Sequence, residues 1–172
     1  TVSHHEYYYT LGHNQNLLGA AYYASALIHL IRGGADLEMR WTATAHSDAY
    51  GLVYLDGKPS PAALAKQLFA QHVKLGDEIN FPANRVATPH LDIIVSYGAN
   101  GRISAIFVNS SRAPISLAPE AIDASLADCK SLFRLDQTTS ERVVAEKLQG
   151  EFTLNGYGIG VITNSGTDTI FE

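Results

Sequence analysis

Glu6, near the start of the chain, is the residue whose type and position best fit a catalytic role. Residues 1–9 are rich in β-branched and aromatic side chains, which predicts a strand that ends near Glu6 or Tyr7. A carboxylate at a strand end could act as a nucleophile, or it could be a solvated edge residue. His4 shares a strand face with Glu6, because alternate strand residues point the same way, so it could line the same site or tune the carboxylate.

The histidines beside Glu6 do not predict a metal site. His4, His5 and Glu6 follow one another directly, so neighbouring side chains point apart along a strand, and no third ligand is spaced to join them. The sequence has one cysteine, Cys129, which excludes an internal disulfide, and it has neither a Cys-x-x-Cys pair nor a glycine-rich phosphate loop. We therefore expect no metal and no cofactor.

A long helix and a second strand are the elements that must position Glu6. An apolar helix is expected over Leu17–Arg32, with Asn14 or Asn16 as its N-cap and two glycines after its end. Residues 35–45 alternate between apolar and polar side chains, which predicts a second strand. A strand, a helix and a strand within about forty-five residues predict a βαβ unit with parallel strands.

The second strand carries Arg40 and Trp41, which are both candidates for substrate contact. If Trp41 points into a pocket, Glu38 and Arg40 face the helices, whereas the opposite parity puts Arg40 in the pocket. Only a local bulge would allow both to face the pocket. Tyr7 begins a polar and aromatic stretch that fits either substrate contacts or an ordinary loop.

The second half of the chain changes to a β pattern. Ser60-Pro61 predicts a helix that runs to about Leu75 and is closed by Gly76. Residues 80–89 contain two prolines and no periodicity, and a boundary is expected there. We predict an α/β segment over residues 1–83, followed by an all-β antiparallel sandwich over residues 84–172. Its strands are expected at 91–97, 102–109 (a hairpin with the first), 115–117, 131–135, 143–148, 151–154 and 158–163.

Composition excludes several classes of partner. The 172 residues are 46% hydrophobic and 17% charged, which indicates a folded chain. A net charge of −5 without a basic cluster argues against nucleic acid. The most apolar run, residues 17–31, is too short to cross a bilayer comfortably, so no membrane partner is expected. Asn109 begins an Asn-Ser-Ser sequon for N-glycosylation.

Four short motifs occur in an order that resembles a known enzyme architecture. Residues 2–7 read Val-Ser-His-His-Glu-Tyr, residues 38–41 read Glu-Met-Arg-Trp, residues 50–62 contain Gly-Leu, Asp-Gly and two prolines, and residues 154–162 read Leu-Asn-Gly-Tyr-Gly-Ile-Gly-Val-Ile. Together they are similar to the carboxyl-terminal part of clan-A retaining glycoside hydrolases with a (β/α)8 barrel. The clan includes xylosidase/iduronidase-like and heparanase/glucuronidase-like enzymes.

The resemblance implies a partial (β/α)8 barrel, made of the last two β/α units, plus a small β-sandwich. In that clan the seventh barrel strand ends in a nucleophilic glutamate and the eighth delivers aromatic or polar residues to the sugar. The resemblance therefore implies hydrolysis of O-glycosidic bonds in a carbohydrate by a retaining mechanism, with Glu6 as nucleophile. It implies substrate contacts from His4, Tyr7, Arg40 and Trp41.

The sequence also departs from the clan. A complete barrel needs about 250 residues, and the clan's acid/base glutamate, which lies in an Asn-Glu pair, has no counterpart in this sequence. We expect a fragment, or a chain that a second polypeptide or self-association completes, and we expect it to be inactive alone. The alternative is a non-catalytic carbohydrate-binding or structural module. A secreted or periplasmic location is favoured over a cytoplasmic one.

Overall fold

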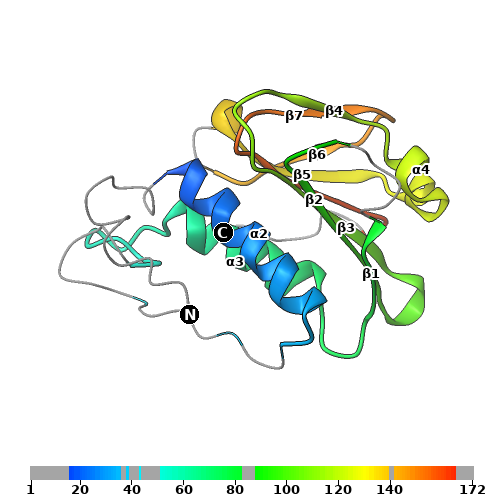
Figure 1. Ribbon diagram of the computed structural model, residues 1–172, viewed down its shortest axis with the longest axis horizontal. Helices are drawn as coiled ribbons and strands as arrows, with labels where there is room; N and C mark the ends of the chain where they lie inside the picture. Colours follow the sequence, from blue (N-terminus) through cyan, green and yellow to red (C-terminus); the bar gives the residue numbers. More distant parts are fainter. Residues whose placement is uncertain are drawn as a thin grey trace.

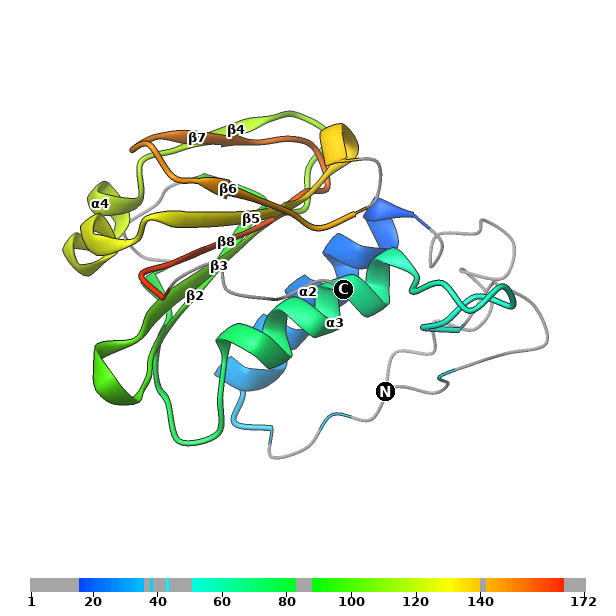
Figure 2. The same ribbon diagram turned by 180° about the vertical axis from the view of Figure 1, so that it is seen from behind.

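A computed structural model describes residues 16–35, 38, 43, 51–82, 88–139 and 142–165. The predicted first strand and most of the second one lie outside these residues. The described part is an α/β fold in which a large antiparallel sheet lies between two helices and a small second sheet (Figures 1 and 2). None of its helices is long and apolar enough to cross a membrane.

Helix α2 spans Leu17–Arg32, the range that the sequence predicts. Its N-cap is Asn16, whose Oδ1 accepts a hydrogen bond from the Gly19 N–H at 3.2 Å. Gly34 follows the helix with a φ of +74°, a conformation that glycine adopts without steric cost. The amino-terminal signal and the carboxyl-terminal glycines therefore fix both ends of this helix.

Helix α3 spans Pro61–His72 and begins as predicted, because Ser60 Oγ accepts a hydrogen bond from the Ala63 N–H at 3.3 Å. It ends at His72 rather than at about Leu75. Val73 already has extended backbone angles, and the His72 carbonyl accepts a hydrogen bond from Arg102 of the sheet at 2.9 Å. A tertiary contact thus takes over one of the last helix carbonyls before the predicted end is reached.

The larger sheet has six strands in the order β1-β2-β3-β8-β5-β6, and β4 and β7 form a separate pair. All these described pairs are antiparallel. The β2–β3 hairpin is joined at residues 98–101, as predicted, with Ile94 opposite Ile106. The strands are β1 Glu78–Asn80, β2 Leu91–Tyr97, β3 Ile103–Asn109, β4 Ile115–Leu117, β5 Ser131–Leu135, β6 Val144–Lys147, β7 Phe152–Leu154 and β8 Ile159–Thr163.

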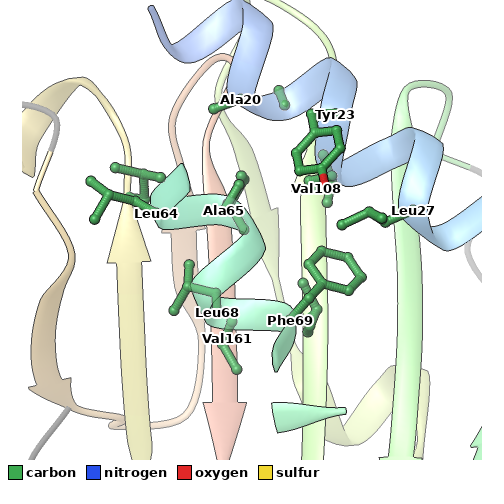
Figure 3. Close-up of a cluster of buried hydrophobic side chains, with 14 of the residues drawn as sticks. Ala20, Tyr23, Leu27, Leu64, Ala65, Leu68, Phe69, Val108 and Val161 are labelled. Carbon is green, nitrogen blue, oxygen red and sulfur yellow. The ribbon is translucent and has the colours of Figure 1, made fainter. Parts of the chain in front are cut away.

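The six-stranded sheet buries both of its faces. Along β3, Ile106 and Val108 belong to the cluster that contains α2 and α3, whereas Phe107 belongs to the cluster under the small sheet. Figure 3 shows the first cluster, in which Leu68 and Phe69 of α3 pack towards the strands. The helices therefore share one hydrophobic core with the sheet.

The predictions for the fold are confirmed in part. The α/β class and the predicted strands from residue 91 onward are present, with small shifts at some ends. The sandwich fits only partly, because the second sheet has two strands and is completed by α4 (Pro119–Ile122) and η4 (Ala124–Asp128). Strand β1 was not predicted. The first predicted barrel strand and most of the second lie outside the described residues, so the partial barrel and the division at residue 83 stay predictions.

Candidate functional site at the amino-terminal end of the helices

The residues that the sequence predicts for the site lie outside the described part of the chain: His4, Glu6, Tyr7, Arg40 and Trp41. The structure describes the elements that follow these residues in the sequence. Helices α2 and α3 begin at the same end of the molecule, where the β7–β8 connection and η5 (Gln137–Thr139) also lie (Figures 1 and 2). In β/α units the strand ends that carry site residues lead into the helix starts, so this end is the candidate site.

The segment before α3 is anchored to the chain around residue 43. The Val53 N–H donates to the Ala43 carbonyl at 2.8 Å, and the Ser60 N–H donates to the Leu52 carbonyl at 2.7 Å. Val53 and Pro59 form an antiparallel bridge across the Asp56-Gly57 turn. The start of α3 is therefore held in place by the region in which the second predicted strand ends.

Glu38 links that predicted strand to both helices. Its Oε1 accepts a hydrogen bond from the Tyr23 hydroxyl at 3.0 Å, and its Oε2 accepts one from Lys66 Nζ at 2.7 Å. Burial and the neighbouring carboxylate raise the pKa of Tyr23. Burial disfavours the charge of Lys66, but its hydrogen bonds to Glu38 and Tyr23 raise its pKa overall. Glu38 therefore has a positioning role, with its carboxylate turned towards the helices.

Asn109, at the end of β3, fastens the loops at this end of the sheet. Its side-chain nitrogen donates to the carbonyls of Ala113, Leu154 and Asn155 at 2.8, 3.2 and 3.1 Å. Its oxygen accepts from the N–H and the hydroxyl of Ser111 at 2.9 and 2.8 Å. The residue is fully buried. The sequon at Asn109 therefore holds a structural amide rather than an accessible acceptor for a glycan.

Asp136 is a second buried anchor and belongs to the same end. Its Oδ1 accepts from the N–H and hydroxyl of Thr138, and its Oδ2 accepts from Asn155 Nδ2 at 3.0 Å. Burial works to raise the pKa of this carboxyl, but these hydrogen bonds and the Arg134 guanidinium lower it overall. Asn155 is thus held through its side chain by Asp136 and through its carbonyl by Asn109.

The turn that follows Asn155 presents an aromatic residue in an uncommon conformation. Tyr157 has a φ of +57°, although glycines stand on both sides of it. A Cβ at Gly156 would lie 2.2 Å from the Arg112 carbonyl oxygen, so the two loops are in direct backbone contact. The Tyr157 hydroxyl accepts a hydrogen bond from Arg112 Nε at 3.2 Å. Sequence reasoning missed this pair, and Gly-Tyr-Gly was its only local signal.

The remaining reactive groups of the described residues do not form a site. Cys129 is buried, and burial raises the pKa of its thiol to about 11, so the thiol stays protonated and inert. Within the described ranges, no three His, Cys, Asp or Glu side chains are grouped as a metal ion would require. The predicted absence of a metal at residues 4–6 concerns residues outside those ranges.

Comparisons with known proteins find likeness in the fold. No family model matches the sequence, and no curated protein matches it. The structure is similar to a glycoside hydrolase family 30 endoxylanase from Clostridium papyrosolvens, with a TM-score of 0.60 and 12% identity over 89% of this chain. It is also similar to a family 30 subfamily 8 xylanase from Clostridium acetobutylicum, with a TM-score of 0.65 and 8% identity over 87% of this chain.

A third similar structure is a conserved exported protein from Bacteroides fragilis, with a TM-score of 0.62 and 13% identity over 86% of this chain. The chain spans 39% of each of the two Clostridium enzymes and 34% of the Bacteroides protein. In its fold, the chain therefore resembles part of a clan-A glycoside hydrolase of the family 30 type.

Proposed function

We propose that this chain is the carboxyl-terminal portion of a retaining glycoside hydrolase. The observation that carries the proposal is the extent of the fold likeness, because the helix pair and the sheet together match family 30 xylanases over almost 90% of this chain. A carbohydrate is the substrate class, and a β-linked xylan is the first substrate to try. The exported Bacteroides protein favours a secreted or periplasmic location.

Glu6 is the proposed nucleophile. In the sequence it lies eleven positions before Leu17, the first residue of α2, so the predicted strand would end at the candidate site. Its carboxylate would attack the anomeric carbon, the glycosidic oxygen would leave with a proton from the acid/base residue, and water would then release the sugar from the ester. The acid/base carboxyl, about 5 Å away, would come from the missing segment or a partner chain. His4 and Tyr7 would contact the substrate beside it.

The contacts of Glu38 favour Trp41 over Arg40 as the second sugar contact. Residues two apart in a strand share a face, and residues three apart do not. Because Glu38 is turned towards α2 and α3, a regular strand would turn Arg40 to the same side and Trp41 to the opposite one. We therefore assign sugar stacking to Trp41, and Arg40 would reach the substrate only through a local bulge.

The test uses the complete enzyme, meaning this chain within its longer polypeptide or with the partner that completes the barrel. Glu6→Gln is expected to lower kcat on xylan by about 10⁴-fold or more, as loss of a covalent nucleophile does in other enzymes. Glu6→Ala with added azide should regain turnover and give a glycosyl azide of inverted anomeric configuration. Glu78→Gln is the matched control and should keep kcat, because Glu78 is exposed in β1. Full activity of Glu6→Gln would exclude the assignment.

A further inference from the structure

We propose that Arg112 and Tyr157 form an outer carbohydrate subsite, which binds a sugar unit remote from the bond that is cleaved. The inference rests on the proposed function for its substrate class, a chain of pyranose rings. Its geometry comes from described residues alone. The two loops that carry the pair are residues 110–114, between β3 and β4, and residues 155–158, between β7 and β8.

The pair stands on a rigid base. The Tyr157 N–H donates to the Ser111 carbonyl at 2.9 Å, and the buried amide of Asn109 joins both loops. Gly156 leaves no space for a side chain against the Arg112 backbone. Binding sites that are fixed before the ligand arrives lose little conformational entropy when it binds. The loops are therefore preorganised in the way that a subsite needs.

The conformation of Tyr157 points to a use for its side chain. A non-glycine residue at a φ of +57° is strained by about 1 kcal/mol or more, and glycine would avoid this cost. The other two described non-glycine residues with positive φ are His90 and Asn100, types for which the conformation is less unusual. A bulky aromatic residue at the strained position of the turn is therefore consistent with a ring that is needed there.

The chemistry of the pair fits a sugar. Arg112 is exposed, and its described side-chain hydrogen bonding is limited to the Nε contact with Tyr157, so its two Nη groups point donors into solvent. A guanidinium can donate in parallel to two neighbouring hydroxyls. Tyr157 is half-buried, so part of its ring remains available for apolar contact with a pyranose.

The other aromatic residues of the described sheet do not offer this combination. Phe107, Phe133 and Phe152 are buried in the two cores. Tyr97 is half-buried, but its hydroxyl donates to Asp123 and contacts Ser125. Phe81 also has an exposed cation, Arg32, over its ring, but it carries no hydroxyl and lies at the other end of α2. Tyr157 therefore combines a half-buried ring, a hydroxyl and an exposed cation at the end where the helices begin.

The position of the pair links it to the candidate site. Tyr157 packs against the same hydrophobic cluster as Leu17, the first residue of α2. The β7–β8 connection lies at the end of the molecule where both helices begin (Figures 1 and 2). A polysaccharide bound at the strand ends could therefore extend over this corner, and the pair would hold one of its distal units.

The experiment is a titration of the 172-residue chain with xylohexaose, followed by ¹⁵N NMR. We expect shifts of the Arg112 Nε–H and of the amides of residues 155–158. Arg112→Ala and Tyr157→Asn, which tolerates the positive φ, should each weaken binding by about tenfold. The matched control is Arg32→Ala, because Arg32 also lies over an aromatic ring, that of Phe81, but at the other end of α2. The control should bind like the unaltered chain.

The result also separates this inference from the proposed function. Unchanged affinity in both variants, with well-dispersed spectra that show folded chains, would overturn the subsite, as would shifts confined to other residues or no binding at all. If Glu6→Gln abolishes cleavage but these variants bind normally, only the subsite fails. If Glu6→Gln leaves cleavage intact and the pair still binds xylohexaose, the subsite stands and the chain acts as a carbohydrate-binding module.

Discussion

The interface between the helices and the sheet is stabilised by different interactions at its two ends, which are the end where α2 and α3 begin and the end where they finish. At the amino-terminal end, Asn109 and Asp136 bind backbone groups and hydroxyls, and the charge of Arg112 is left at the surface. At the carboxyl-terminal end of α3, Arg102 donates to both oxygens of Asp77 at 2.7 Å and to the His72 carbonyl at 2.9 Å.

The comparison separates a binding role from a stabilising one. At the carboxyl-terminal end of α3, the charge of Arg102 is neutralised within the protein by Asp77. The Asp77 side chain is only 5% exposed and also accepts hydrogen bonds from the Ser96 hydroxyl and the Lys74 N–H. The cation at the amino-terminal end stays available to a ligand. If the two ends have these separate roles, variants at one end should lose stability independently of the other end and under different conditions.

The largest effect is expected at Asn109. Asn109→Ala removes all five side-chain hydrogen bonds and leaves buried carbonyls unpaired, so the free energy of unfolding should fall by about 4 kcal/mol. Urea unfolding of the purified chain measures this. Asn164→Ala is the control, since Asn164 is exposed although its side chain also bonds two backbone groups. Equal losses in the two variants would contradict the structural role assigned to Asn109.

The role of Asn109 also shows the limit of what the sequence can predict. Local signals predict α2 and the β2–β3 hairpin, because Asn16, Gly33 and the turn at residues 98–101 act on their direct neighbours. The same reasoning reads Asn109 as a sequon. The Leu154 and Asn155 carbonyls that it binds are 45 and 46 residues away, and its bonds to the nearby Ser111 and Ala113 do not reveal that it is buried. Strand β1 is missed because its three residues are defined by their pairing with β2.

The candidate site, like the fold, can be predicted from the sequence only in part. The prediction for Glu6 comes from its residue type, its place in the predicted strand within residues 1–9 and the resemblance of residues 2–7 to clan-A glycoside hydrolases, and it stays a prediction. Arg112 and Tyr157 are 45 residues apart and are brought together by backbone contacts between two loops. No spacing rule indicates such a pair before the sheet is known.

The second largest effect is expected at Asp77. Asp77→Asn leaves the partly buried Arg102 without its counter-charge, so the free energy of unfolding should fall by about 3 kcal/mol. Asp56→Asn is the matched control, because Asp56 forms its ion pair with Lys58 in full solvent and no measurable change is expected. The two variants are compared by thermal unfolding. A loss in Asp56→Asn as large as that in Asp77→Asn would refute the distinction between buried and exposed pairs.

The third effect is a pH dependence of stability, confined to the carboxyl-terminal end of α3. His72 is buried against Phe133, with ring centroids 5.2 Å apart, and its Nδ1 lies 3.5 Å from Ser104 Oγ. Burial, with the positive charges of Arg102 and Lys74, lowers its pKa from 6.5 to about 4. The unfolded chain therefore binds a proton at a higher pH than the folded chain does. Stability should fall as the pH drops from about 6.5 to about 4, by roughly 2–3 kcal/mol.

His72→Gln tests this window, because glutamine stays neutral and its stability should vary less between pH 6.5 and 4. The carboxylates do not give this slope, since the pKa values of Asp77 and Asp136 are both lowered and their stabilisation is lost only as the pH falls below about 3.8. Hydrogen-exchange protection of α3 should therefore drop at pH 4.5, while that of residues 155–158 should not. Equal loss of protection at both ends would show that they are coupled.

The smallest effect on stability is expected at Tyr157. This variant best distinguishes a ligand-binding role from a stabilising one. Tyr157→Asn relieves backbone strain of about 1 kcal/mol but removes partial burial of a ring, so the two changes should nearly cancel and the melting temperature should shift by a few degrees at most. Asn109→Ala, which acts on the same loops, should instead lower stability and binding together. If the variant keeps its stability but loses affinity for xylohexaose, Tyr157 has a ligand-binding role. A variant that loses several kcal/mol would instead place it with Asn109, as part of what holds the corner of the sheet together.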